Sequence, residues 1–158
     1  MNTKETIKKL VCESIEAKRK MLDCGHIEYI EKIADKIAQA YKNNKKTLIC
    51  GNGGSASDAL HFAAEMVCRF EKNRAAIASI ALSENISTVT AIGNDFGYDL
   101  VFSRQLEAFA REGDIFIAVS TRGNSPNIIK AVETAKKMGI FTIGMTNEDG
   151  GRIKDLCD

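Results

Sequence analysis

Four short apolar segments alternate with helical patterns from Lys46 onward, and this alternation is the feature that most restricts the fold. We expect strands at 46–50, 77–83, 115–119 and 140–145 and helices at 56–70, 85–92, 100–111 and 127–138. The strand candidates are apolar without strict alternation, which is typical of strands buried on both faces. Such an order predicts a parallel sheet with helices on both sides. We therefore expect residues 45–158 to form an α/β core.

Two amphipathic helices are expected before the first strand, at residues 3–22 and 27–42. Apolar residues recur at helical spacing in both, and Gly25 is expected to end the first. We predict that residues 1–44 form a helical hairpin. Its apolar stripe needs a partner surface, which is either a second subunit, favouring an oligomer, or the chain's own sheet.

The composition excludes several classes of function. The 158 residues suit one domain, and 22 basic against 21 acidic residues give a net charge of +1, too little to attract nucleic acid. No apolar run approaches the roughly 18 residues of a membrane span, and the N-terminus has no signal-peptide pattern. The five cysteines match no disulfide framework or CxxC metal site, which indicates free thiols and a cytoplasmic location.

Ligands of parallel sheets bind beyond the carboxyl ends of the strands, so the polar segments after each strand are the site candidates. The first is the glycine turn 51–55, with the sequence GNGGS, directly followed by a helix. Backbone N–H groups and the helix dipole converge at such a turn and can hold an anion. The turn matches neither a Walker loop nor a dinucleotide-binding fingerprint.

The helix after this turn carries Asp58, His61 and Glu65 at spacings of three and four, which places them on one face. A histidine and a glutamate four residues apart can share a metal ion or face a common substrate. A carboxylate in a partly dry cleft can also act as a general base. The alternative is a surface pair that only stabilises the helix.

The segment STRGNS at 120–125 is the sharper candidate for binding phosphate. Ser120, Thr121 and Ser125 offer hydroxyl groups, and Gly123 allows close approach of the backbone. Pro126 suits the first position of a helix, whose N-terminus would then point at the loop. The alternative is an ordinary turn with Ser125 as the N-cap.

A third polar segment, residues 93–97, is expected to be a turn between helices. Asn94 and Asp95 could bind sugar hydroxyl groups there, although the same residues occur in turns without any function.

Three segments in this order resemble the sugar isomerase (SIS) domain family, and more narrowly its bacterial sedoheptulose 7-phosphate isomerases: CGNGGSASDALHFAAEM, AIGNDFGYDLVFSRQ and STRGNSPNIIKA. The resemblance implies a flavodoxin-like sheet of five strands, a homotetramer with active sites between subunits, and a zinc ion. It also implies an aldose–ketose isomerisation of sedoheptulose 7-phosphate to glycero-manno-heptose 7-phosphate through an enediol(ate). That reaction would lead to the heptose of lipopolysaccharide or other surface polysaccharides.

The resemblance implies roles for individual residues as well. His61 and Glu65 match zinc ligands in the catalytic centre, and Glu65 also matches the catalytic base. The positions that match substrate-binding residues are Asn52, Gly53, Gly54, Ser55, Asn94, Asp95, Ser120, Thr121, Arg122 and Ser125.

Two departures from the family pattern affect these expectations. Arg122 replaces the second serine of the usual STSGNS, and arginine there also occurs in relatives that bind the bacterial replication initiator. The alternative function is therefore a non-catalytic module that binds a phosphosugar or a protein, although such relatives lack the counterpart of Glu65. The family also continues past Asp158 with a strand and a helix that supply a zinc-binding glutamine and histidine. We expect a chain without them to have an incomplete metal site and weak or absent isomerase activity.

Overall fold

The computed structural model describes residues 2–23 and 25–158. Its residues divide into two units, Met1–Ala38 and Gln39–Asp158. The elements are, in chain order, α1 (Thr3–Asp23), α2 (His26–Lys42), β1 (Thr47–Gly51), α3 (Gly54–Val67), β2 (Ser79–Ala81), α4 (Ile86–Phe96), η1 (Tyr98–Leu100), α5 (Ser103–Phe109), β3 (Ile115–Val119), α6 (Pro126–Lys137), β4 (Phe141–Met145) and η2 (Gly151–Asp155).

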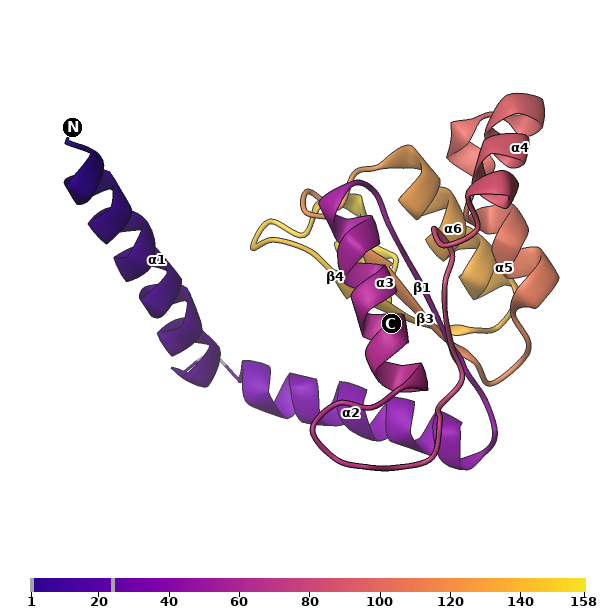
Figure 1. The fold of residues 1–158 in the computed structure, drawn as a ribbon, viewed down its shortest axis with the longest axis horizontal. Helices are drawn as coiled ribbons and strands as arrows, with labels where there is room; N and C mark the ends of the chain where they lie inside the picture. The colour runs from indigo at the N-terminus through magenta and orange to yellow at the C-terminus, as the bar shows by residue number, and fades with distance from the viewer. Residues whose placement is uncertain (1, 24) are drawn as a thin grey trace. The chain divides into compact units, whose positions relative to one another are not determined.

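The second unit is built on a parallel sheet with the strand order β2-β1-β3-β4, in which β1 and β3 lie side by side (Figure 1). Gly51 at the end of β1 is paired with Val119 at the end of β3, so the segments that follow these two strands start side by side. The parallel α/β architecture predicted from the sequence is confirmed. The described residues form four strands, where the resemblance implied five.

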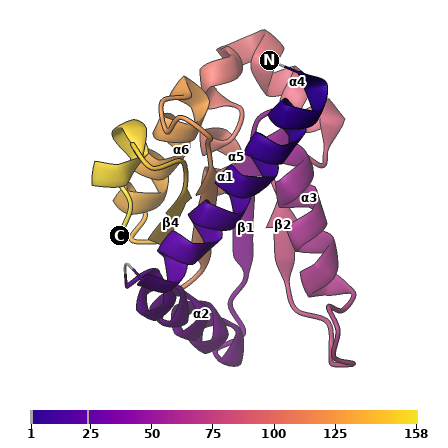
Figure 2. The same ribbon diagram turned by 90° about the vertical axis from the view of Figure 1, so that its left-hand side faces the viewer.

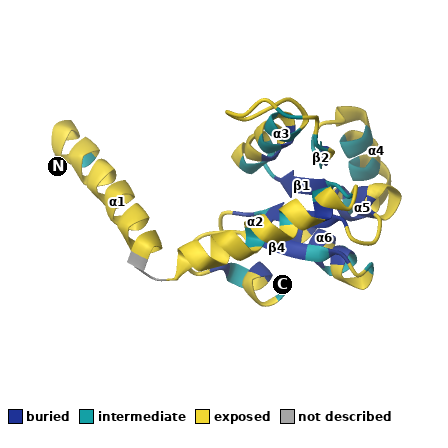
Figure 3. Cartoon of the chain, turned by 90° about the horizontal axis from the view of Figure 1, so that it is seen from below, coloured by how far each residue is buried: buried dark blue, intermediate teal, exposed yellow. Residues whose placement is uncertain are grey.

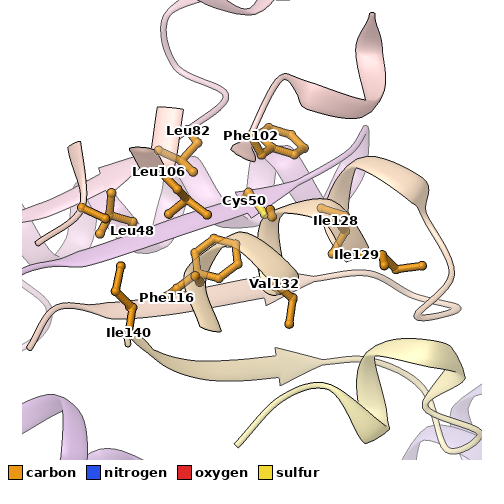
Figure 4. Close-up of a cluster of buried hydrophobic side chains, with 14 of the residues drawn as sticks. Leu48, Cys50, Leu82, Phe102, Leu106, Phe116, Ile128, Ile129, Val132 and Ile140 are labelled. Atoms are coloured by element: carbon orange, nitrogen blue, oxygen red, sulfur yellow. The ribbon is translucent and has the colours of Figure 1, made fainter. Parts of the chain in front are cut away.

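The sheet separates two sets of buried side chains. Leu48, Cys50 and Phe116 project to one face, where they pack with residues of α5 and α6 such as Leu106 and Val132 (Figure 4). Because strand side chains alternate between faces, Ile49 and Ile117 project to the other. There α3 packs along β1 and β2 (Figure 2). Burial between helix layers explains why the strands are almost uniformly apolar.

Several element boundaries differ from the sequence prediction. Strand β2 covers only Ser79–Ala81, and the N–H of Ile77 donates instead to the carbonyl of Met66 at the end of α3. Helix α5 begins at Ser103 because the preceding residues form the short helix η1. The predicted turn at 93–97 is wrong: residues 93–96 continue α4, which ends at Phe96 and is followed by the C-cap Gly97 with φ of 91°.

The first unit consists of α1 and most of α2, as the helical periodicity predicts. Most of its residues are exposed (Figure 3), including large apolar side chains of the predicted stripe such as Ile7, Leu10 and Ile15. Cys24, which the sequence places at the end of the first helix, lies outside the described residues. The packing of the two helices as a hairpin stays a prediction.

Two further expectations concern the class of protein. Among the described residues, Cys12, Cys50, Cys68 and Cys157 are free thiols, as expected. Burial raises the pKa of the Cys50 thiol well above its ordinary value, so this side chain behaves as an apolar core residue. No helix in residues 2–23 and 25–158 combines the length and the apolar character that a membrane crossing requires.

Candidate active site

The glycine turn joins β1 to α3 at the carboxyl edge of the sheet. A Cβ at Gly51 would overlap the backbone of Ser55, so only glycine permits the helix to start this close to the strand. Gly53 occupies the N-cap position with φ of 54° and provides no side-chain cap. The N–H groups of Ser55 and Ala56 donate to the carbonyls of Asn52 and Gly53, both at 3.0 Å, so the first turn of α3 closes directly on the glycine turn. Gly53 and Gly54 are exposed, whereas Asn52 and Ser55 are half-buried.

Helix α3 carries the three polar residues predicted to share one face. The structure brings two of them together: His61 Nε2 lies 3.3 Å from Glu65 Oε1. The His61 side chain is 76% exposed and that of Glu65 37%, so the carboxylate is the more enclosed member of the pair. Asp58 is exposed and is not hydrogen-bonded to either residue within the described part of the chain. The structure therefore forms a pair, rather than a triad, on this face of α3.

Arg74 fixes the end of α3 that carries Glu65. Its guanidinium donates to the carbonyl oxygens of Glu65 and Met66, each at 2.8 Å. Carbonyl groups in the last turn of a helix lack intrahelical donors, and a cation there also complements the helix dipole. Arg74 therefore ties the loop after α3 to the turn of the helix that holds the carboxylate.

The loop after β3 has the geometry expected of an anion site. Ser120 is buried, and its Oγ lies 3.4 Å from Oγ of Ser125. Ser125 is the N-cap residue of α6, with Pro126 in the first turn, but its side chain makes no capping bond. Its hydroxyl group therefore remains directed at Ser120 and the loop. This arrangement differs from the ordinary N-cap that was the alternative reading.

The loop after β4 is hydrogen-bonded to the loop after β3, which is the candidate anion site. The carbonyl oxygens of Thr121 and Gly123 accept hydrogen bonds from the N–H groups of Asn147 and Ile153, both at 3.1 Å. Asn124 Oδ1 accepts from Arg152 N, also at 3.1 Å. These oxygens are engaged by the neighbouring loop, which keeps them from repelling an anion. We call residues 120–125 the phosphate loop.

Two residues that the sequence analysis missed, Asn127 of α6 and Tyr98 of η1, hold Asn52 of the glycine turn. The side-chain amides of Asn52 and Asn127 exchange a reciprocal pair of hydrogen bonds, each of 2.9 Å. Tyr98 Oη donates to Asn52 Oδ1 at 3.2 Å. The available signal was weak: Asn127 is a polar residue before the apolar pair Ile128 and Ile129 in a helix that must cover the core.

The remaining predicted site residues lie apart from these contacts. Asn94 and Asp95 are exposed on the last turn of α4, where Asn94 Nδ2 donates to Asp95 Oδ1 at 2.8 Å. The structure gives them no hydrogen bond to the glycine turn or the phosphate loop within the described residues. Thr121 and Arg122 are exposed, and the Arg122 carbonyl packs against Gly151.

The described residues do not form a complete metal site. His61 and Glu65 are close enough to share a zinc ion, whose bonds to nitrogen and oxygen are about 2.0–2.2 Å. However, no group of three His, Cys, Asp or Glu residues in the described ranges is placed to hold a metal ion. Two donors do not complete the tetrahedral set that zinc requires.

Comparisons with known proteins agree on one family. Residues 12–147 match the SIS domain. The chain is 51% identical to a phosphoheptose isomerase of Clostridium acetobutylicum over 156 residues, covering 98% of this chain and 80% of that protein. A solved phosphoheptose isomerase from Neisseria gonorrhoeae matches 99% of this chain and 82% of its own, with 40% identity and a TM-score of 0.91. One from Francisella tularensis matches 100% of this chain and 82% of its own, with 32% identity and a TM-score of 0.94.

Proposed function

Because this chain belongs to the SIS domain family, and within it to the phosphoheptose isomerases, we propose that Glu65 is the base of its aldose–ketose isomerisation. Sedoheptulose 7-phosphate is the substrate and glycero-manno-heptose 7-phosphate the product. The observation that carries the assignment is the half-enclosed Glu65 carboxylate, paired with His61 on the helix that leaves the glycine turn.

The reaction requires one proton to move between neighbouring carbon atoms. Glu65 removes a proton from C1 of the ketose, and the C2 carbonyl oxygen gains the charge of the enediolate. Transfer of the C1 hydroxyl proton to the C2 oxygen, with return of a proton to C2, gives the aldose, so no electron acceptor is consumed. The His61 contact holds the Glu65 carboxylate in place, and Arg74 holds the backbone of the same turn. A positioned base of this kind supplies about 10²–10⁴-fold of the rate.

The phosphate loop would hold the other end of the substrate. The phosphate sits on C7, far along the sugar chain from the reacting C1–C2 bond, so separate anchors on separate elements suit this molecule. Ser120 and Ser125 supply hydroxyl donors, and the N-terminus of α6 adds backbone N–H groups. The glycine turn, with Asn52, Gly53, Gly54 and Ser55, would contact the sugar between them, and Asn94 and Asp95 would add contacts at its margin.

We predict that replacing Ser120 and Ser125 together by alanine weakens phosphosugar binding by about tenfold to a hundredfold, because two hydrogen bonds to a charged group are lost. Calorimetric titration with sedoheptulose 7-phosphate measures this, beside an assay of its conversion by the unmodified chain. Thr134→Ala, on the same helix but away from its N-terminus, is the control. Unchanged affinity in the double variant contradicts the role of the loop, and failure of the unmodified chain to bind sedoheptulose 7-phosphate contradicts the function.

We also propose that His61 and Glu65 contribute to a zinc site, one per subunit, with the other ligands supplied from outside the described set. When bound, zinc would stabilise negative charge on substrate oxygen atoms. The support is the donor chemistry of the pair and its 3.3 Å contact.

The expected result for zinc is binding that depends on His61. His61→Ala should weaken zinc binding by about tenfold or more. Mutation of residues that only hydrogen-bond to a metal ligand already has effects of this size, and His61 is proposed as a ligand itself. Competition with a chromophoric chelator measures the affinity. Asp58→Ala, on the same exposed face of α3, is the matched control and should leave it unchanged. Equal zinc affinity in all three proteins contradicts the proposal.

The assembly and cellular role are further parts of the proposal. We propose a cytoplasmic homotetramer that supplies heptose for lipopolysaccharide or another surface polysaccharide. The apolar residues exposed on α1 and α2 support an oligomer, and the free thiols support a reducing compartment. Arg122 suggested a non-catalytic binding module as the alternative function. The presence of Glu65, which such modules lack, favours the enzyme.

A further inference from the structure

We propose that Asn127 is a positioning residue that acts through Asn52, and that the two amides fix the distance between the phosphate loop and the sugar-binding glycine turn. This inference rests on the function proposed above. Asn127 lies in the first turn of α6, directly after the phosphate loop, and only 2% of it is exposed. It is therefore a buried polar residue at the joint between two ligand-binding segments, and it is unlike the apolar residues that follow it.

The two hydrogen bonds between Asn52 and Asn127 fix the orientation of both side-chain amides. Each amide donates one hydrogen bond to the other and accepts one, both at 2.9 Å. Leaving a buried amide without a partner costs about 1–3 kcal/mol, so the pair resists separation. Rotation of either amide alone would face oxygen with oxygen and nitrogen with nitrogen. The two side chains must therefore keep a common orientation.

The pair leaves Asn52 with one unused hydrogen-bond donor. Asn52 Oδ1 accepts from both Asn127 Nδ2 and Tyr98 Oη, and one N–H of Asn52 Nδ2 is taken by Asn127. Within residues 2–23 and 25–158 the second N–H of Asn52 has no acceptor. Since Asn127 and Tyr98 hold the oxygen side of the amide, this N–H is the part of Asn52 available to a sugar oxygen.

The backbone on either side explains why this contact sets a distance. Strands β1 and β3 are neighbours, and Gly51 and Val119 are paired at their ends. Asn52 follows the first of these residues, and the phosphate loop follows the second. Phosphate bound at the N-terminus of α6 is thus connected to the sugar-contacting amide through one buried side chain. Loss of that connection should misplace C1 relative to Glu65 and leave the phosphate loop intact.

A double-mutant cycle separates this role from simple stabilisation of the fold. Asn127→Ala should lower kcat for sedoheptulose 7-phosphate by about tenfold to a hundredfold, the effect of misplacing a substrate by about 1 Å. The dissociation constant of inorganic phosphate should stay within about twofold. Because Asn127 acts through Asn52, the double Ala variant should be no slower than Asn52→Ala. Effects that multiply, or phosphate affinity that falls in step with kcat, overturn the proposal.

Two further variants guard against misreading a folding defect. Gln105→Ala removes another buried amide, which donates to the carbonyls of Leu82 and Val101 and not to Asn52; it should reduce stability and leave kcat unchanged. Asn127→Asp keeps the side-chain volume but loses the donor to Asn52, and should slow turnover as the alanine variant does. An equal loss of kcat in Gln105→Ala, or full activity in Asn127→Asp, overturns the role.

Failure of the proposed function would be recognised separately. If the unmodified chain does not bind sedoheptulose 7-phosphate, that function is refuted. If it binds this sugar phosphate without converting it, the same cycle is measured on the dissociation constant of the sugar phosphate against that of inorganic phosphate. Non-additive losses confined to the sugar phosphate support the pair. Additive losses, or equal affinities for the two ligands in the unmodified chain, overturn it.

Discussion

Glu65→Gln is expected to lower kcat for sedoheptulose 7-phosphate by about 10²–10⁴-fold, the contribution of a positioned general base. The carboxamide has nearly the same size and can still meet His61, whose Nε2 lies 3.3 Å from the carboxylate. It cannot take a proton from C1, however. The change therefore removes the base, together with one proposed zinc ligand, and leaves the helix and the His61 contact in place. Steady-state kinetics with direct detection of the aldose product measure the effect.

The binding of phosphate distinguishes loss of the base from loss of the site. Inorganic phosphate should bind Glu65→Gln and the unmodified chain equally, because the phosphate loop lies on other elements, after β3 and at the start of α6. Asp58→Asn makes the same chemical change on an exposed carboxylate of α3 and should retain full activity. Turnover by Glu65→Gln at the rate of the unmodified chain would refute the assignment of the base.

The sequence predicts the sheet well because each strand is recognisable from its own residues. Each strand is a short apolar run followed by a polar segment, and the buried pattern of β1 and β3 matches that expectation. The segment at 93–97 was predicted wrongly because Gly, Asn and Asp favour turns locally. In the structure, the space at Gly93 is bordered by Tyr98 and Val101, and helix α4 continues to Phe96. Packing against the following segment overrides the local preference.

In the candidate site, the sequence predicts the contacts between residues near in the chain and misses the contact between distant residues. His61 with Glu65, and Ser120 with Ser125, are each close in the chain, so their spacing predicts their contact. The pairing of Asn52 with Asn127 joins residues 75 positions apart, and no local pattern encodes it. That contact depends on β1 lying beside β3, which the alternation of strands and helices does not determine by itself.

Gly123→Ala is expected to be the most destabilising of the changes considered, because Gly123 lies where two loops meet. The residue has φ of 64°, a conformation that costs other residues about 1–2 kcal/mol. A Cβ there would also overlap the carbonyl oxygen of Gly150, in the backbone of the loop after β4. Such overlap typically costs a further 1–3 kcal/mol or so. The sum of these costs is a loss of roughly 2–5 kcal/mol in the free energy of unfolding.

Gly139→Ala is the matched control for this change. Gly139 has nearly the same backbone conformation, with φ of 69°, and nothing lies within 4 Å of an added Cβ. It should therefore show the conformational cost alone, so that urea unfolding of the two variants isolates the cost of the contact between loops. Because the carbonyl of Gly123 also accepts from Ile153, separation of the loops should weaken binding of inorganic phosphate in Gly123→Ala only. Equal destabilisation by the two substitutions would mean that the loops yield freely, and that the loop after β4 does not hold the phosphate loop in shape.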